Sequence, residues 1–283
     1  MLASIRISFA ILGRFAPPLA GRLAARLFAR PRRHARPQRE RDLIARGTPL
    51  TLPGGLRATE WGEGPVVLLV HGWEGRGAQL GALVDPLVAA GYRVVALDGP
   101  AHGDSPGRST SAPEFVEALR ATRDAVGPIA AIVGHSFGGF TSLLAIAHGL
   151  DAGRLVTIGA PSSVPEVLRD FQRLVHLPDR AVPAMVRALE RRVGAPMASF
   201  DVASFAPRVR APVLVVHDVG DEEVPYADAT RLVELLGARL LRTEGVGHRR
   251  ILYAPDVVSA IVEFIEAGKP VPPAHLPQME RQS

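Results

Sequence analysis

Short apolar runs, each bounded by turn residues, recur along most of this chain and alternate with stretches of helical periodicity. Because the runs are continuous rather than alternating, they are typical of strands buried on both faces of a sheet. The predicted strands are 56–61, 65–70, 92–97, 129–133, 154–158, 212–217 and 239–243. The predicted helices are 78–90, 113–126, 137–149, 226–236 and 255–267. This alternation indicates an α/β fold with a mostly parallel, doubly wound sheet.

Three segments depart from that rhythm. Residues 1–48 are basic and punctuated by apolar positions, and they precede the α/β domain that we predict at 49–267. Residues 161–210 carry short helical patterns between prolines. We expect them to form a helical cap over the carboxyl ends of the strands, where open α/β sheets bind ligands. Residues 268–283 are Pro-rich and polar and indicate a tail.

The positive charge of the chain is concentrated near its beginning. Residues 1–46 contain 11 Arg against two acidic residues, Glu40 and Asp42, so this segment carries +9 and the remainder −4 of the overall +5. The α/β domain thus has no basic patch of its own, and we expect no nucleic-acid binding by it. The chain has no Cys, which excludes disulfides, thiolate metal sites and a Cys nucleophile.

The apolar positions of residues 1–30 suit a surface helix. No stretch reaches the roughly 18 consecutive apolar residues of a membrane span. Leu19, Leu23 and Leu27 fall on one helical stripe, with Arg22 and Arg26 nearby. We expect the stripe to pack on the protein itself. Peripheral contact with an anionic membrane surface and a cleaved signal peptide are the alternatives. We expect a cytoplasmic protein, with peripheral membrane association through residues 1–30 as the alternative. The sequence predicts no oligomeric state.

The strongest chemical signal is Gly134-His135-Ser136-Phe137-Gly138-Gly139. It lies between a predicted strand and a predicted helix, which is the context of a nucleophile elbow, G-x-S-x-G. The turn is so tight that only residues without a side chain fit at Gly134 and Gly138, and the backbone at Ser136 is expected to be strained. The sequence therefore predicts Ser136 as a nucleophile.

A serine hydroxyl needs a general base, and the base needs an orienting carboxylate. His248 is predicted as the base, because it lies in a Gly-rich loop between the last strand and the last helix. For the acid we favour Asp221, a few residues past the strand at 212–217, with Asp218 as the rival. We interpret His217 as an interior residue and Glu222 and Glu223 as solvated charges.

The oxyanion of a tetrahedral intermediate needs hydrogen-bond donors. The backbone N–H of Phe137 and that of Trp73, in the loop after the strand at 65–70, are the predicted pair. His71 and His135 are expected to hold loops in place. The Gly-rich segment 98–105 is expected to be structural as well.

Taken together and in order, these motifs make residues of about 50–267 resemble an α/β-hydrolase fold protein of the bacterial esterase and lipase-like kind. The resemblance implies a triad of Ser136, Asp221 and His248, and no cofactor and no metal. One departure is that Asp218 stands where a small residue is usual. The Arg-rich residues 1–46 lie outside the resemblance.

We therefore predict a serine hydrolase that cleaves small carboxylic esters through an acyl-enzyme. A thioesterase, an acyltransferase or another triad hydrolase is the alternative within the fold, and a non-catalytic membrane-surface protein is the alternative outside it. Six apolar residues are expected to accommodate a short or medium acyl chain: Trp73, Phe137, Leu174, Val175, Leu177 and Met185.

Overall fold

The computed structural model describes residues 2–268 of the chain, so the tail predicted at 268–283 lies, apart from Gly268, outside the described residues. Its centre is an eight-stranded sheet in the order β1-β2-β4-β3-β5-β6-β7-β8. The strands are β1 Thr48–Thr51, β2 Arg57–Trp61, β3 Val66–Val70, β4 Arg93–Asp98, β5 Ile129–His135, β6 Leu155–Ile158, β7 Val213–Asp218 and β8 Arg239–Thr243. Strand β2 pairs antiparallel with β1 and β4, and all other pairs are parallel.

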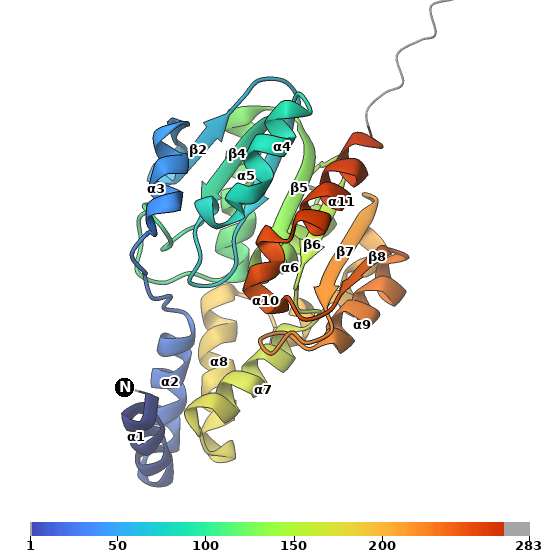
Figure 1. The fold of residues 1–283 in the computed structure, drawn as a ribbon. Coiled ribbons are helices and arrows are strands. Elements are labelled where there is room, and N and C mark those ends of the chain that lie inside the picture. Colours follow the sequence, from blue (N-terminus) through green and yellow to red (C-terminus); the bar gives the residue numbers. More distant parts are fainter. Residues whose placement is uncertain (1, 269–283) are drawn as a thin grey trace, which may run out of the picture.

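Helices cover both faces of this sheet (Figure 1). The α-helices of the described residues, those of the cap included, are α1 Leu2–Phe15, α2 Pro17–Phe28, α3 Gln38–Ala45, α4 Val84–Ala89, α5 Ala112–Val126, α6 Phe137–Ala147, α7 Val164–Val175, α8 Val182–Val193, α9 Tyr226–Leu236, α10 Gly247–Arg250 and α11 Pro255–Glu266. Strand β3 is fully buried. Its residues point alternately into two separate cores. Val66, Leu68 and Val70 belong to the core on the side of α5, α6 and α9. Val67 and Leu69 belong to the core on the side of α4 and α11. The predicted α/β-hydrolase fold is confirmed.

Several elements differ from the prediction, including the short helix α10, which was expected to be a loop. The helix expected over 78–90 is a 3₁₀ helix at Gly77–Leu83 followed by the short α4, and the backbone kinks at Leu80. Strand β1 was not predicted, because its sequence, Thr-Pro-Leu-Thr, is short and contains Pro. Its position at the sheet edge explains why Pro49 is tolerated there.

The segment 161–210 forms α7, α8 and several short 3₁₀ turns beyond the carboxyl end of β5. Helices α1 and α2 lie beside α7 and α8 at this end of the molecule (Figure 1), with α2 packed along α8 and α1 against α7. The N-terminal segment is therefore part of the cap layer.

The packing face of α2 is not the predicted one. Helix α2 meets α8 through small residues, Ala20, Gly21 and Ala24, which are fully or almost fully buried. A Cβ at Gly21 would lie 2.7 Å from both the Cβ of Ala184 and the backbone nitrogen of Met185, so only Gly permits this close approach. The stripe of Leu19, Leu23 and Leu27 faces outward instead. The helix therefore packs on the protein as expected, but through its small residues and not through the leucine stripe.

Residues 31–46 fasten the N-terminal helices to the α/β domain by ion pairs. Arg36 contacts Asp98 at 2.9 Å and Asp104 at 2.7 Å. Glu40 on α3 forms a buried ion pair with Arg76. No helix within residues 2–268 has the length and apolar character that crossing a bilayer requires.

Candidate active site

Ser136 occupies a tight turn between β5, which ends at His135, and α6, which begins at Phe137. Its φ of 52° and ψ of −122° lie outside the regions that an L-residue readily adopts. A Cβ at Gly134 would lie 2.6 Å from Gly138 O, and one at Gly138 would collide with Val70 O. The turn thus requires Gly on both sides of the serine, as predicted.

His248 and Asp221 are joined by a hydrogen bond of 2.7 Å between Nδ1 and Oδ2. The other carboxylate oxygen of Asp221 accepts from the backbone N–H groups of Glu223 and Val224 at 2.8 and 2.9 Å. Burial alone would raise the pKa of Asp221, but these bonds outweigh it and lower the pKa below its usual value. The carboxylate is therefore charged at neutral pH and fixes Nδ1 as the protonated ring nitrogen.

Asp218, the rival acid, has a different role. It lies at the end of β7, fully buried, and accepts from Thr243 Oγ1 at 2.9 Å and from the N–H of Val246 at 3.0 Å. Its other oxygen accepts from the N–H of Gly220. Asp218 therefore holds the loop that leads into α10, the helix that carries His248, while the hydrogen bond to the imidazole comes from Asp221.

His248 and Ser136 line the same cavity. Within residues 2–268, the hydroxyl of Ser136 has no hydrogen bond, a common state in unliganded sites, where such bonds tighten on substrate binding. A carboxylate oxygen of Glu223 lies 3.9 Å from His248 Nε2, while Glu223 is also paired with Arg249 at 2.9 Å. Glu223 is exposed, which agrees with its interpretation as a solvated charge at the rim of the cavity.

Two backbone N–H groups border the same place. Phe137 is the first residue of α6, so its N–H has no acceptor within the helix. Trp73 lies in a turn closed by a 3.0 Å hydrogen bond from the N–H of Gly75 to Gly72 O, with Glu74 at a φ of 58°. Neither N–H has an acceptor among the described residues. Both groups are thus available to a negatively charged oxygen.

Three buried histidines brace the loops of the site. The Nε2 of His71 accepts from the N–H of Gly99 at 2.9 Å. The Nε2 of His102 accepts from the N–H of Glu74 at 3.0 Å, and His135 donates to His248 O at 2.9 Å. Burial lowers the pKa of His71 to about 4 and the pKa of both His102 and His135 to about 3. All three are neutral at pH 7, which suits the loop-holding role predicted for His71 and His135. His102 was not singled out.

A cavity of about 1190 Å³ opens in front of Ser136. Its apolar wall includes Trp73, Phe137, Leu174 and Val175, as expected. Leu177 and Met185 were also expected but do not line it; they are buried in the core between the cap and α2. Apolar residues that were not anticipated also line it, among them Phe28, Val164, Val167, Phe171, Leu189, Met197 and Phe200.

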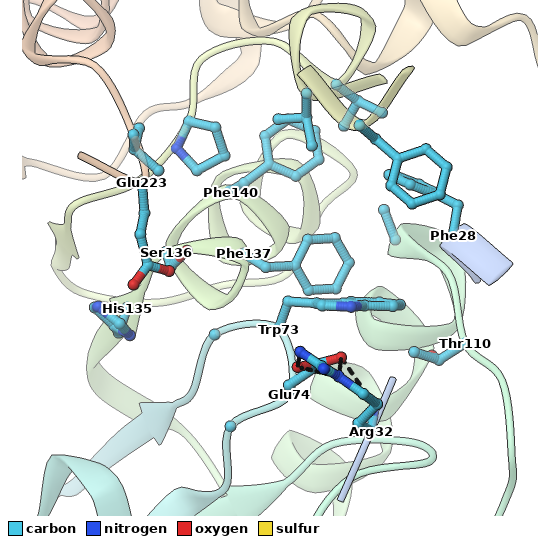
Figure 2. A pocket seen from close by; sticks show the side chains of 18 of the residues that line it. Phe28, Arg32, Trp73, Glu74, Thr110, His135, Ser136, Phe137, Phe140 and Glu223 are labelled. Atoms are coloured by element: carbon cyan, nitrogen blue, oxygen red, sulfur yellow. Dashed lines mark hydrogen bonds and ion pairs between the residues drawn. The ribbon is translucent and has the colours of Figure 1, made fainter. Parts of the chain in front are cut away.

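The N-terminal segment contributes directly to this wall. Phe28, the last residue of α2, stacks on Trp73 with ring centroids 6.3 Å apart, and Trp73 meets Phe137 edge-on at 5.4 Å (Figure 2). Arg32 then donates to both carboxylate oxygens of Glu74, which adjoins Trp73. An aromatic residue at the end of an amphipathic helix was the available sequence signal, but no pattern indicated which part of the fold it would reach.

His, Asp and Glu side chains within residues 2–268 form no cluster of three or more that could hold a metal ion.

Comparisons with known proteins agree with this geometry. A model of the alpha/beta hydrolase fold family matches residues 65–214, and a model described as TAP-like protein matches 195–274. A pimeloyl-[acyl-carrier protein] methyl ester esterase of Aromatoleum aromaticum is 29% identical over 253 residues, which cover 72% of this chain and 99% of that protein. A non-heme chloroperoxidase of Streptomyces lividans is 26% identical over 262 residues, or 74% of this chain and 95% of that protein.

Among solved structures, a monoacylglycerol lipase of Paleococcus ferrophilus superposes with a TM-score of 0.61 at 23% identity. The match covers 76% of this chain and 99% of the lipase, and at this identity it supports the fold alone. The family model matches more than half of the chain, from the first buried strand to the strand that precedes Asp221. This chain therefore belongs to the alpha/beta hydrolase fold family and is a hydrolase.

Proposed function

We propose that the protein hydrolyses carboxylic esters through an acyl-enzyme formed on Ser136. The observation that carries the proposal is the 2.7 Å hydrogen bond between Asp221 and His248 at the edge of the cavity that Ser136 lines. A carboxylate on Nδ1 leaves Nε2 unprotonated, which is the state that a general base requires. Ser136, held at a strained turn at the helix N-terminus, is the nucleophile that this base serves.

In the proposed reaction, Ser136 Oγ attacks the ester carbonyl carbon while His248 Nε2 takes the hydroxyl proton. The tetrahedral intermediate collapses when the bond to the alcohol oxygen breaks, and His248 gives its proton to that oxygen. Water then attacks the acyl-enzyme with His248 again as base, and the acid leaves as the proton returns to Ser136. Asp221 stabilises the imidazolium in both halves without taking up a proton.

The N–H groups of Trp73 and Phe137 are the proposed oxyanion donors. Both are backbone groups on elements fixed by packing, so they need little reorganisation when charge develops on the carbonyl oxygen. Loss of one such donor typically costs about 2.7–4 kcal/mol of transition-state stabilisation. Glu74, clamped by Arg32, keeps the turn that carries Trp73 in place.

The cavity supports an apolar acyl group. Aromatic and aliphatic side chains dominate the wall on the cap side, and the volume of about 1190 Å³ exceeds what an acetyl group needs. One relative at 29% identity is named as a methyl ester esterase, which agrees with a carboxylic ester as substrate. We therefore propose esters of medium-length acyl chains.

The test combines active-site labelling with turnover. A fluorophosphonate probe should label the native protein, and nitrophenyl esters should be hydrolysed fastest at medium acyl length. Ser136→Ala should abolish both, whereas Ser199→Ala, an exposed serine outside the cavity, should change neither. Absence of labelling in the folded native protein, or labelling that persists in Ser136→Ala, would overturn the proposal.

A further inference from the structure

Helices α1 and α2 expose apolar side chains in ordered rows. On α1 the row is Ile7, Ile11 and Phe15, of which Phe15 is 77% exposed and Ile7 60%. On α2 the row is Leu19, Leu23 and Leu27. A spacing of four residues keeps each row on one side of its helix. Isolated exposed apolar residues are ordinary, but two rows of three on two helices that contact each other are more than scattered exposure.

Packing within the chain does not explain these rows. The opposite side of α2 is already buried against α8 through Ala20, Gly21 and Ala24. On α1, Phe9 is buried and Arg6 donates to Leu174 O of α7 at 2.8 Å. The two helices are thus docked by one side and leave the two apolar rows exposed.

Arginines accompany the apolar rows. Residues 1–30 contain five Arg and no Asp or Glu. Arg22 and Arg26 each precede a leucine of the α2 row, so they run alongside it, and Arg30 follows two residues after the end of the helix. The described part of the chain offers no ion pair to the four exposed arginines of this segment, Arg14, Arg22, Arg26 and Arg30.

The exposed surface reaches the cavity. Leu27, the last residue of the α2 row, and Arg30 both line the cavity in front of Ser136, as does Ile5 of α1. Phe28 lies further in, stacked on Trp73 (Figure 2). An apolar molecule leaving a surface on which α2 rests would therefore meet the cavity wall at Leu27 and Phe28.

We propose that the outer side of α1 and α2 docks on an anionic phospholipid surface. The leucine, isoleucine and phenylalanine rows enter the acyl boundary, and the arginines contact lipid phosphates, which is the chemistry of an interfacial amphipathic helix. A second copy of the chain fits less well as the occupant, because two such faces would bring like charges together without an acid to neutralise them. The proposal concerns binding and does not depend on which bond the enzyme cleaves.

The first test is co-sedimentation of the full chain with vesicles of phosphatidylglycerol and phosphatidylcholine and with vesicles of phosphatidylcholine alone. Native protein should bind the anionic vesicles, and added salt should weaken binding. A variant with Ile11→Ser, Phe15→Ser and Leu23→Ser should bind at least about tenfold more weakly, since each change removes apolar area from the bilayer boundary. The matched control, Val219→Ser with Leu240→Ser, removes exposed apolar residues elsewhere and should bind as the native protein does.

The second test addresses charge. Arg14→Gln, Arg22→Gln and Arg26→Gln together should weaken anionic-vesicle binding about a hundredfold at low salt. Arg108→Gln, Arg123→Gln and Arg210→Gln, which remove equal charge from other exposed sites, should change it little. Hydrolysis of a water-soluble ester should be unaffected in all these variants.

Three results would overturn the proposal. The first is that native protein does not bind anionic vesicles, and the second is that the variants of α1 and α2 bind them as well as their controls do. The third is sedimentation equilibrium in which native protein is dimeric and the apolar triple variant monomeric, since that result would identify a second copy as the occupant.

Discussion

Gly159 allows a direct measurement of how strongly the position of His248 controls turnover. It follows β6 with a φ of 57°, and a Cβ there would lie 3.0 Å from His248 Nδ1 and 3.3 Å from Asp221 Oδ2. Ordinary contacts begin near 3.4 Å, so the methyl group of Gly159→Ala pushes the imidazole by a few tenths of an ångström, away from its 2.7 Å bond. Because a misplacement of about 1 Å costs about a hundredfold in rate, we expect kcat to fall about tenfold.

The same substitution also strains the backbone. An L-residue in the left-handed region costs roughly 1–2 kcal/mol, which lowers Tm by about 2–4 °C per kcal/mol in a chain of this size. Gly237→Ala is the matched control, because its φ is 60° and nothing lies within 4 Å of the added Cβ. Both variants should lose similar thermal stability, but only Gly159→Ala should lose activity against nitrophenyl esters. Equal kcat values in the two variants would refute the proposed role of the His248 ring.

Three further predictions concern the acids, the buried histidines and the cavity wall. Asp221→Asn should lower kcat by about 10³–10⁴-fold through loss of the required imidazole tautomer, whereas Asp218→Asn should act mainly on thermal stability; the opposite ranking in a turnover assay would contradict the assignment. Burial lowers the pKa of His135 to about 3, so the unfolded chain binds a proton at this residue more readily than the folded chain does. As the pH drops through about 6.5, the free energy of unfolding should therefore decrease, and this residue contributes up to about 1.4 kcal/mol per pH unit to the decrease. Urea unfolding at pH 7.5 and 5 measures this, and His135→Asn should flatten the dependence; an identical slope in native protein and variant would contradict it. Phe28→Ala should raise KM for medium-chain esters and leave acetate esters unaffected, whereas Phe15→Ala should leave both unchanged in solution; equal effects on both ester lengths would argue against Phe28 as part of the acyl wall.

Much of the α/β domain could be predicted because its signals are local. The continuous apolar run of β3 and the Gly-flanked Ser136 each carry their structural meaning within a few residues. The choice between Asp221 and Asp218 could not be made in this way. It depends on where the loop of residues 243–247 lies, and that loop provides Thr243 and Val246 as partners for Asp218.

The N-terminal helices show the limit of hydrophobic periodicity. The pattern of α2 points to its leucines as the packing side, because small residues contribute little to an apolar stripe. The helix instead packs through Gly21 and its Ala neighbours, since close approach to α8 gains more contact than the leucines would at a larger separation. Nothing in residues 17–28 indicates that a matching surface exists in the cap, or that Phe28 would reach Trp73.

The pairing of α2 with α8 also has a consequence for biosynthesis. Helix α2 ends at Phe28 and its partner begins at Val182, so the ribosome must add about 150 residues before the contact can form. At roughly 5–20 residues per second, the nascent α1 and α2 remain without their cap neighbours for about 8–30 s. During that interval the apolar and cationic residues of α1 and α2 are exposed outside the exit tunnel, where chaperones or lipids can bind them before synthesis of the enzyme is complete.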